Sequence, residues 1–247
     1  MKTLIIGGGG REDALAWKLS LSPHVTKIYT APGNAGTLRY GENVAISPDD
    51  IKGLMEFALK NSIDLTVVGP ELPLTLGIVD AFRAEGLLIF GPTKEAAAIE
   101  GSKAFCKKML IAADIPTADY ETFNNTEEAQ KYLSTAKLPL VVKADGLAAG
   151  KGVIICHTLA EAEDAVTLIL GEKAFGEAGK EIIIEEFLEG EEASYLAITD
   201  GSGVAALAPA QDHKAIFDGD RGPNTGGMGA YSPAPIITPL LEKKILN

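Results

Sequence analysis

The stretch Met1-Lys2-Thr3-Leu4-Ile5-Ile6-Gly7-Gly8-Gly9-Gly10 places a short apolar run directly before four glycines. Short apolar runs bounded by turn residues are typical of buried strands. Apolar residues at helical spacing follow in residues 11–20. A strand, a glycine turn and a helix in this order form the first unit of a parallel α/β sheet. We therefore predict an α/β fold whose first strand covers residues 3–6.

The rest of the first hundred residues continues this alternation of strand and helix. We expect further strands at residues 27–30, 65–68 and 87–90. The run Ser47-Pro48-Asp49-Asp50 combines a capping residue, a proline at the first helical position and acidic residues, so we expect Ser47 to cap a helix. The strand at 65–68 ends at Gly69-Pro70-Glu71. Ligands of open α/β sheets bind at such carboxyl ends of strands.

After residue 101 the pattern changes to a mixture of helices, hairpin-like strands and glycine-bearing loops. We expect helices at 102–112 and from Asn125 and Thr158, strands at 138–143, 153–156 and 182–186, and a loop at 175–179. This order predicts a small α+β lid, about residues 120–192, on a larger body. We therefore divide the chain into a Rossmann-like parallel-sheet domain at residues 1–101 and an α+β domain at residues 102–247.

Composition and charge exclude several classes of protein. Hydrophobic residues make up 46% and charged residues 23%, which excludes a disordered chain. The 22 basic and 34 acidic residues give a net charge of −12, which disfavours a duplex nucleic-acid or anionic-membrane surface. No apolar stretch approaches the roughly 20 residues that span a bilayer, and the first residues do not resemble a signal peptide. Cys106 and Cys156 have no zinc or disulfide spacing, so we expect a reduced, cytoplasmic protein.

The four glycines are the first candidate binding site. They follow a strand and open a helix, where unpaired backbone N–H groups and the helix dipole favour a phosphate. The spacing excludes a dinucleotide motif, because Glu12 or Asp13 stands where its third glycine belongs. We expect a substrate phosphate near Gly9 and Gly10. The alternative is a tight turn with no ligand.

The segment from Lys143 to Gly152 is the second candidate site. It is not a P-loop, because Asp145 and Gly152 stand where that motif needs glycine and a hydroxyl residue. What remains is a lysine on a strand followed by a glycine-rich hairpin. The hairpin can fold its backbone amides over a triphosphate while Lys143 contacts the inner phosphates. The alternative is an exposed lysine beside an ordinary hairpin.

The third candidate site is acidic and follows a buried strand, with the sequence Glu185-Glu186-Phe187-Leu188-Glu189-Gly190-Glu191-Glu192. Backbone groups around Glu186 and Leu188 can bond the adenine edge. The Glu192 carboxylate can accept both hydroxyls of a ribose. These features fit an adenosine site, and the alternative is a solvated acidic loop.

The fourth candidate site begins at Gln211. Residues 218–233 are rich in glycine and polar side chains, which predicts a long functional loop that contacts an anionic substrate and the transferring phosphate. Asp212 and His213 fit an acid/base pair, and a role in positioning the substrate is the alternative.

These four elements in this order resemble the phosphoribosylamine–glycine ligases, also called glycinamide ribonucleotide synthetases, an ATP-grasp family of purine biosynthesis. The resemblance covers essentially all of the chain. Its most specific pieces are Gly7-Gly8-Gly9-Gly10-Arg11-Glu12, Ala31-Pro32-Gly33-Asn34-Ala35-Gly36, Val68-Gly69-Pro70-Glu71, Gly101-Ser102-Lys103, and residues 143–152, 185–192 and 223–233. It implies that the N-terminal domain is a pre-ATP-grasp domain and that residues 102–247 form an incomplete ATP-grasp domain.

The resemblance also implies the reaction. ATP would phosphorylate the carboxylate of glycine, and the amine of 5-phosphoribosylamine would attack the acyl phosphate, giving glycinamide ribonucleotide, ADP and phosphate. Catalysis of this kind depends mostly on positioning and charge neutralisation. The implied cofactors are ATP and Mg²⁺ or Mn²⁺. We expect a monomer or weak dimer with no nucleic-acid or membrane partner.

Residue roles follow from the same resemblance. ATP would be bound by Lys103, Lys143, Gly146, Gly150, Lys151, Gly152, Glu185, Glu186, Leu188 and Glu192. The substrate would be bound by Gly9, Gly10, Asn34, Glu71, Thr225 and Gly226. Asp212, Lys214 and Asn224 would act in catalysis.

The chain departs from the family pattern in two places. Asp13 stands where the family usually has histidine, which puts a negative charge one turn into the helix beside the proposed phosphate. The family's later strand with its metal ligands and its C-terminal domain have no counterpart in these residues. We therefore expect no metal site here, weak binding of adenine nucleotide at best and no complete ligase reaction by these residues alone.

Two other functions remain open from the sequence. One is another ATP-grasp ligase of purine synthesis, such as a carboxylase, which is distinguished by the acid and amine that stimulate ATP hydrolysis. The other is a truncated, non-catalytic nucleotide-binding fragment.

Overall fold

The computed structural model describes residues 1–148, 151–219 and 221–246. By its internal contacts the chain divides into two compact units, Met1–Phe187 and Leu188–Asn247, which we call the first and second unit. The predicted division at residues 101 and 102 stays a prediction. None of the helices in the described ranges is long and apolar enough to cross a membrane.

The first unit begins with a five-stranded parallel sheet in the order β3-β2-β1-β4-β5. Its strands are β1 (Lys2–Gly7), β2 (Lys27–Pro32), β3 (Glu42–Asn43), β4 (Leu65–Val68) and β5 (Ile89–Phe90). The order reverses between β1 and β4, and such a switch point opens a crevice at the carboxyl ends of the two strands. The structure confirms the predicted parallel α/β sheet and adds β3, which is too short to give a periodic signal.

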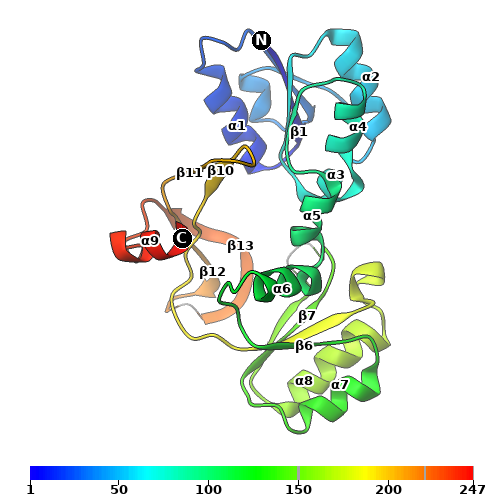
Figure 1. Cartoon of the computed structure of the whole chain (residues 1–247), viewed down its shortest axis with the longest axis vertical. Coiled ribbons are helices and arrows are strands. Elements are labelled where there is room, and N and C mark those ends of the chain that lie inside the picture. The colour runs from blue at the N-terminus through cyan, green and yellow to red at the C-terminus, as the bar shows by residue number, and fades with distance from the viewer. Residues whose placement is uncertain (149–150, 220, 247) are drawn as a thin grey trace. The chain divides into compact units, whose positions relative to one another are not determined.

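Helices cover both faces of this sheet, which explains why β1 is apolar throughout. The helices are α1 (Gly10–Ser20), α2 (Ile51–Asn61), α3 (Glu71–Leu76) and α4 (Ile78–Ala84). Ile5 packs in a cluster with Ala16 of α1, whereas Leu4 packs with Leu54 of α2 and Phe82 of α4. Figure 1 shows α1 on one side of β1 and α2 and α4 on the other. Successive strand residues point to opposite faces, so one apolar run supplies both cores.

The cap predicted at Ser47 is wrong. Helix α2 begins at Ile51, and the Asp50 side chain caps it by accepting a hydrogen bond from the backbone N–H of Gly53. Ser47 instead accepts the Asp50 N–H through its carbonyl oxygen and donates its hydroxyl to Asp49. The four residues therefore form a turn before the helix, and the second acidic residue is the cap.

A second sheet in the first unit is antiparallel, with the order β6-β9-β7-β8. Its strands are β6 (Tyr120–Phe123), β7 (Leu140–Ala144), β8 (Val153–Cys156) and β9 (Ile182–Glu186). The nearby helices are α5 (Lys94–Gly101), α6 (Lys103–Ala112), α7 (Thr126–Leu133) and α8 (Leu159–Val166). Helices begin where the sequence predicts them, and the Ser102, Asn125 and Thr158 side chains cap α6, α7 and α8.

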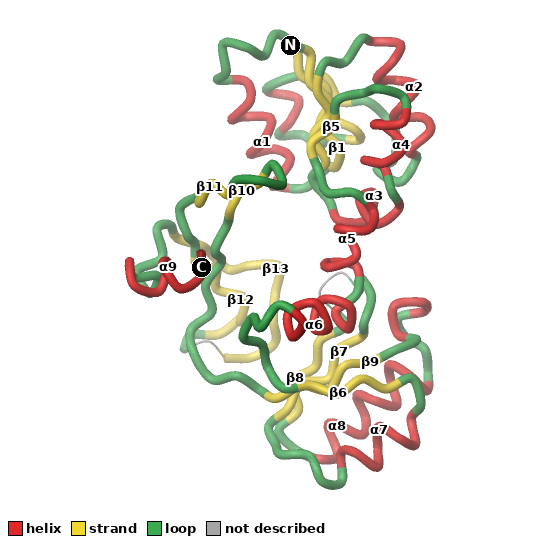
Figure 2. Tube along the Cα trace, in the orientation of Figure 1, coloured by secondary structure: helices red, strands yellow, loops and turns green. Residues whose placement is uncertain are grey.

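The two faces of the antiparallel sheet differ in chemistry. Val142 and Ile184 pack against Ala162 and Val166 of α8 in an apolar core. Figure 2 shows α7 and α8 along one face of the sheet and α6 on the other. Lys143 and Glu185 each stand next to one of the core residues, so they point to the face that α6 covers.

The second unit consists of two ribbons and a helix. The strands are β10 (Ala197–Thr199), β11 (Val204–Ala206), β12 (Gln211–Phe217) and β13 (Arg221–Tyr231), and the helix is α9 (Pro239–Leu246). Strand β10 pairs with β11 and β12 with β13, both antiparallel. The loop predicted at residues 218–233 is therefore mostly a strand. The register of its ladder shifts twice, at residues 213–217 of β12, which lets a glycine-rich segment pair despite its poor strand propensity.

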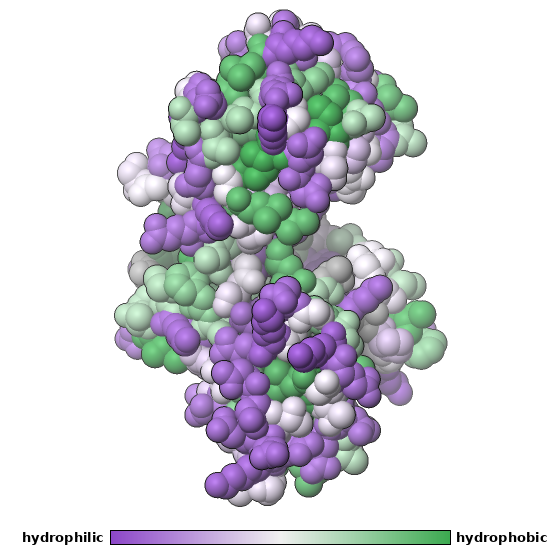
Figure 3. Space-filling view, turned by 90° about the vertical axis from the view of Figure 1, so that its right-hand side faces the viewer, coloured by the Kyte–Doolittle hydropathy of each residue, from purple (hydrophilic) through white to green (hydrophobic). Residues whose placement is uncertain are grey.

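Several large apolar side chains of the first unit are exposed. Leu72 and Leu76 of α3 and Ile99 of α5 are each about half exposed. Figure 3 shows a strip of adjoining apolar side chains in the middle of the face that it draws, with hydrophilic side chains around it. Folded chains commonly expose apolar side chains, so this exposure indicates no function by itself.

Candidate functional site

The turn between β1 and α1 lies at the switch point of the parallel sheet. Gly7 has a φ of 120°, a conformation that favours glycine. The Glu12 side chain is 3% exposed and accepts a hydrogen bond from the Gly9 N–H. Added Cβ atoms at Gly7 or Gly69 would overlap the Glu12 side chain. The Glu12 side chain therefore fits here only because both positions are glycine. A Cβ on Gly10 would meet nothing within 4 Å, which leaves this end of α1 open.

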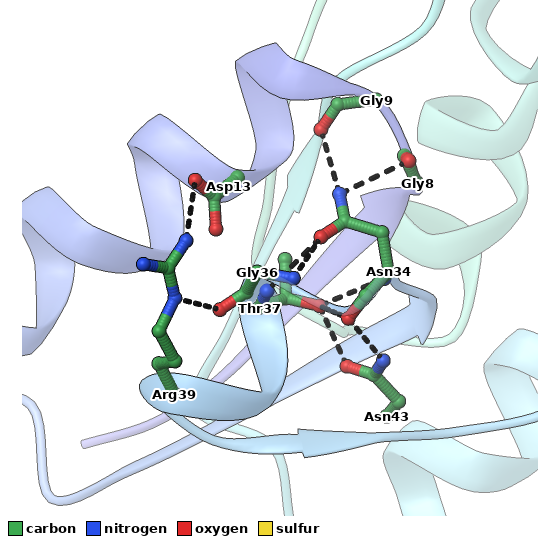
Figure 4. A network of polar contacts seen from close by, with 8 residues as sticks. All are labelled: Gly8, Gly9, Asp13, Asn34, Gly36, Thr37, Arg39 and Asn43. Carbon is green, nitrogen blue, oxygen red and sulfur yellow. Dashed lines mark hydrogen bonds and ion pairs between the residues drawn. The ribbon is translucent and has the colours of Figure 1, made fainter.

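Asn34 ties the loop after β2 to this turn (Figure 4). Its Nδ2 donates to the carbonyl oxygens of Gly8 and Gly9, each at 3.1 Å. Its Oδ1 accepts from the N–H groups of Gly36 at 2.7 Å and Thr37 at 3.1 Å. All four hydrogen bonds that an amide readily makes are thus present, and they fix its orientation.

Charged side chains surround the same turn. Arg11 donates to Glu71 at 2.9 Å. Burial raises the pKa of Glu71, but hydrogen bonds from its own backbone N–H and from Arg11, with the Arg11 charge, outweigh it and lower the pKa. Asp13 lies 3.9 Å from Arg39, so a cation partly balances the charge that the sequence places here (Figure 4). The predicted substrate residues Gly9, Gly10, Asn34 and Glu71 therefore gather at one end of the sheet.

The start of α6 is joined to the glycine-rich segment after β7. The Asp145 carboxylate accepts from the Ser102 hydroxyl at 3.0 Å and from the Ala104 N–H at 2.7 Å. The Lys103 ammonium donates to the carbonyl oxygens of Asp145 at 3.2 Å and Gly146 at 3.1 Å. Burial lowers the pKa of Lys103, and the charges of Asp145 and Glu100 oppose this shift. The predicted ATP residues Lys103 and Gly146 are thus in direct contact.

Glu185 lies between two lysines on the α6 face of the antiparallel sheet. Its carboxylate is 5% exposed, and one oxygen pairs with Lys143. The other oxygen lies 2.6 Å from the Lys107 ammonium, which is 11% exposed. Lys107 also donates to the Thr117 hydroxyl at 2.8 Å and the Ala118 carbonyl at 2.9 Å.

The two lysines have different electrostatic surroundings. Burial, together with the positive charges of Lys107 and Lys103, lowers the pKa of Lys143 to about 8. The paired carboxylate of Glu185 opposes that shift, because an adjacent negative charge favours the protonated amine. Burial also lowers the pKa of Lys107, and the surrounding Tyr120, Cys106, Glu186 and Asp119 oppose it.

In the second unit, Lys214 of β12 pairs with two carboxylates. Its ammonium contacts Glu192 and lies 3.7 Å from Asp212. The hydrogen bond to Glu192 raises the pKa of Lys214, although burial acts in the opposite direction. The Thr225 hydroxyl donates to the Lys214 carbonyl at 2.9 Å. The structure therefore brings together Glu192, Asp212, Lys214 and Thr225, to which the resemblance assigns roles in ATP binding, catalysis and substrate binding.

The remaining predicted site residues have simpler surroundings. Leu188 is 64% exposed. Glu186 accepts from the Asp119 N–H at 3.1 Å. A Cβ at Gly152 would press on Ala148 and Ala144, one at Gly226 would meet nothing within 4 Å, and Lys151 donates its N–H to Ala148 at 3.0 Å. Gly150 and the side chain of Asn224 lie outside the described residues.

Three residues of these clusters were missed at the sequence level. Lys107 follows Lys103 by four residues, so its position on the same helix face was available as a signal. Glu12 stands three residues after the helix cap, where a carboxylate commonly returns to the cap N–H. Asp145 has no local signal, because its partners are 41 to 43 residues away in the chain.

No metal site is visible in the parts of the chain that the structure describes. Among residues 1–148, 151–219 and 221–246, no group of three or more His, Cys, Asp or Glu side chains is arranged to hold a metal ion.

Comparisons with known proteins match the chain to one family along its whole length. Residues 1–100 match the family model of the phosphoribosylglycinamide synthetase N domain, and residues 101–247 match that of its ATP-grasp (A) domain. Phosphoribosylamine–glycine ligases of Pasteurella multocida and Haemophilus influenzae are 58% and 57% identical over 100% of this chain. The chain spans 58% of the length of each of these relatives.

Two solved structures have folds similar to that of this chain, and the first is a phosphoribosylamine–glycine ligase. A crystal structure of phosphoribosylamine–glycine ligase from Thermotoga maritima has a TM-score of 0.80 and 36% identity, covering 100% of this chain and 59% of that one. N5-carboxyaminoimidazole ribonucleotide synthetase from Thermus thermophilus has a TM-score of 0.69 and 23% identity, covering 99% of this chain and 61% of that one. The second likeness concerns the fold alone. Together, the two family models account for the whole chain, which belongs to the phosphoribosylglycinamide synthetase family.

Proposed function

We propose that this protein acts as an ATP-dependent ligase that joins glycine to 5-phosphoribosylamine and forms glycinamide ribonucleotide, ADP and phosphate. The observation that carries the proposal is the 58% identity to a phosphoribosylamine–glycine ligase over 100% of the chain. The two clusters of binding groups in the first unit support it, because one suits an anion at a helix N-terminus and the other presents lysines to a polyphosphate.

Each part of the chain takes a role in this proposal. Residues 1–101 bind phosphoribosylamine, with its phosphate at Gly9 and Gly10 and with Asn34 and Glu71 beside it. Residues 102–247 take the nucleotide under a lid of about residues 120–192. Lys103 and Lys143 neutralise phosphate charge, as phosphoryl transfer requires.

The residues after the lid complete the proposed nucleotide and substrate contacts. Gly146, Gly150, Lys151 and Gly152 cover the phosphates, and Glu185, Glu186, Leu188 and Glu192 hold adenosine. Asp212, Lys214, Asn224, Thr225 and Gly226 contact glycine and the acyl phosphate. ATP is used with a divalent cation, Mg²⁺ or Mn²⁺, and no step is assigned to the ion, because the described residues contain no group of three or more acidic, His or Cys side chains placed around one point. We further propose a cytoplasmic location and a monomer or weak dimer.

The test measures product formation directly. The full-length protein is mixed with ATP, a magnesium salt, glycine and freshly generated phosphoribosylamine, and glycinamide ribonucleotide is quantified by mass spectrometry. Product that requires all three substrates supports the proposal. If bicarbonate and an aminoimidazole ribonucleotide stimulate ATP hydrolysis and glycine does not, the proposal is wrong and the protein is a carboxylase.

A pair of variants connects the activity to the cationic cluster. Lys143→Ala should weaken ATP binding by about 1.5–3 kcal/mol, the usual contribution of a hydrogen bond to a charged group. Lys108→Ala is the matched control, because Lys108 lies on the exposed surface of α6. Titration calorimetry on both variants gives the comparison, and equal affinities would remove Lys143 from the nucleotide site.

A further inference from the structure

Lys107 and Lys143 share one buried carboxylate but are not equivalent. The Lys107 ammonium has three acceptors, Glu185, Thr117 and Ala118, which match its three N–H groups. Lys143 has Glu185 as its one partner among the described residues, and it is 27% exposed where Lys107 is 11% exposed. Lys107 is therefore fully bonded and fixed, whereas Lys143 keeps donors that a ligand can use.

The free energy needed to separate Lys143 from Glu185 depends on Lys107. Glu185 is 5% exposed, and a buried carboxylate that loses its only cation becomes strongly unfavourable. With Lys107 in place, Glu185 keeps a charged partner at 2.6 Å when Lys143 turns away. Without Lys107, every contact between Lys143 and a phosphate would leave Glu185 unpaired.

We propose that Lys107 is a positioning residue for nucleotide binding, which holds Glu185 permanently so that Lys143 can exchange Glu185 for a phosphate of the nucleotide. The inference rests on the proposed function in one respect, since it takes ATP as the ligand of Lys143. It adds that the resting ion pair of Lys143 is temporary and that a second lysine, on α6, makes its release possible.

The main test is a double-mutant cycle on ATP affinity in the full-length protein. Lys107→Met should raise the Kd for ATP with magnesium at least about tenfold, because binding then leaves a buried carboxylate unpaired. Glu185→Gln alters the Kd by itself, because Glu185 is also proposed to contact adenosine, so its own Kd is the reference for this background. Relative to that Kd, Lys107→Met should raise the value less than about twofold, because a neutral amide needs no cation. Lys107→Arg should restore most of the affinity, since it keeps the charge. Lys108→Met on the exposed side of the helix is the control and should leave the Kd unchanged.

Each outcome of the cycle has a definite meaning. Equal losses in both backgrounds would show that Lys107 acts only by bracing Thr117 and Ala118, and they would overturn the inference. Unchanged affinity in Lys107→Met would overturn it as well. A parent protein that binds no ATP would instead refute the nucleotide site of the proposed function, and the inference with it. Circular dichroism checks folding, and Lys107→Gln, which keeps a donor for Ala118, replaces Lys107→Met if that variant does not fold.

The pH dependence of binding provides an independent measurement. The charged groups that face Lys143 are Lys103 and Lys107 of α6 and Glu185 of β9. ATP affinity should fall as the pH rises past about 8 and Lys143 loses its proton. Removing the positive charge of Lys107 raises the pKa of Lys143, so in Lys107→Met this fall should move to higher pH. An unchanged position of the fall would show that the charge of Lys107 does not act on Lys143, and that result would count against the inference.

Discussion

Changing Asn34 to aspartate replaces an NH₂ group with an oxygen in a side chain that uses both of its donors and its acceptor. The two donors bond the carbonyl oxygens of Gly8 and Gly9 at 3.1 Å. In aspartate these contacts become two oxygens facing each other, while the bonds from the N–H groups of Gly36 and Thr37 remain. Two lost hydrogen bonds at roughly 0.5–1.5 kcal/mol each give a loss of about 1–3 kcal/mol.

This loss should appear as local opening of the loop after β2. Hydrogen exchange of protected amides follows the free energy of opening, so about 1–3 kcal/mol corresponds to exchange roughly 5- to 150-fold faster. We expect this increase in peptides covering residues 7–13 and 33–43, measured by mass spectrometry. The added negative charge should also raise the KM for phosphoribosylamine, because the proposed phosphate position is next to Gly9.

Asn125→Asp is the matched control. The Asn125 side chain caps α7 by accepting from the N–H groups of Glu127 at 2.8 Å and Glu128 at 3.1 Å, bonds that a carboxylate keeps. A negative charge at a helix N-terminus is also favourable. Exchange in α7 should therefore stay unchanged or become slower. An Asn34→Asp protein whose loop exchanges like the parent would refute the assignment of its two donors.

Other changes test the remaining contacts of the first unit. Asp145→Ala should lower the thermal stability of the first unit by about 1.5–3 kcal/mol in calorimetry, because α6 loses a charged hydrogen-bond acceptor at its start. Gly69→Ala should cost about 1–3 kcal/mol in denaturant unfolding, because the new methyl group overlaps the buried Glu12 side chain. Burial raises the pKa of Cys156 to about 11, so this thiol should resist alkylation up to about pH 9 while the partly exposed Cys106 reacts, as read by peptide mass spectrometry.

Local signals in the sequence were sufficient for much of the fold. The strand at residues 65–68 and the helix cap at Asn125 are as predicted, because each depends on residues that are neighbours in the chain. Ser47 is not the cap because several polar residues lie in one turn. Asp50 is the residue whose side chain faces the first free N–H groups of the helix. The glycine-rich β13 was predicted as a loop because its pairing with β12 comes from the partner strand and not from its own propensity.

The candidate site could be predicted as a set of residues but not as a set of contacts. Lys103, Lys143 and Glu185 were found from motifs and resemblance. Their pairing depends on the register of β7 against β9, in which Val141 lies opposite Glu185 and places it diagonally from Lys143 on one face. A shift of one residue would turn Lys143 toward the apolar core. Register is set by the whole sheet, so no single segment of the sequence contains this information.

The charged residues of strands β7 and β9 nevertheless limit which side chains can pair on this face of the sheet. Strand β7 carries one charged residue, Lys143, among apolar ones, and β9 carries three isoleucines followed by Glu185 and the exposed Glu186. A buried charge must have a partner, so two neighbouring strands with opposite charges on one face are expected to pair. A Lys–Glu pair by itself is neutral, so attraction of an anion depends on further cations, here Lys103 and Lys107 of α6. Lys107 adds a positive charge while also pairing with the carboxylate, and our inference is that this second pairing lets Lys143 exchange Glu185 for a phosphate.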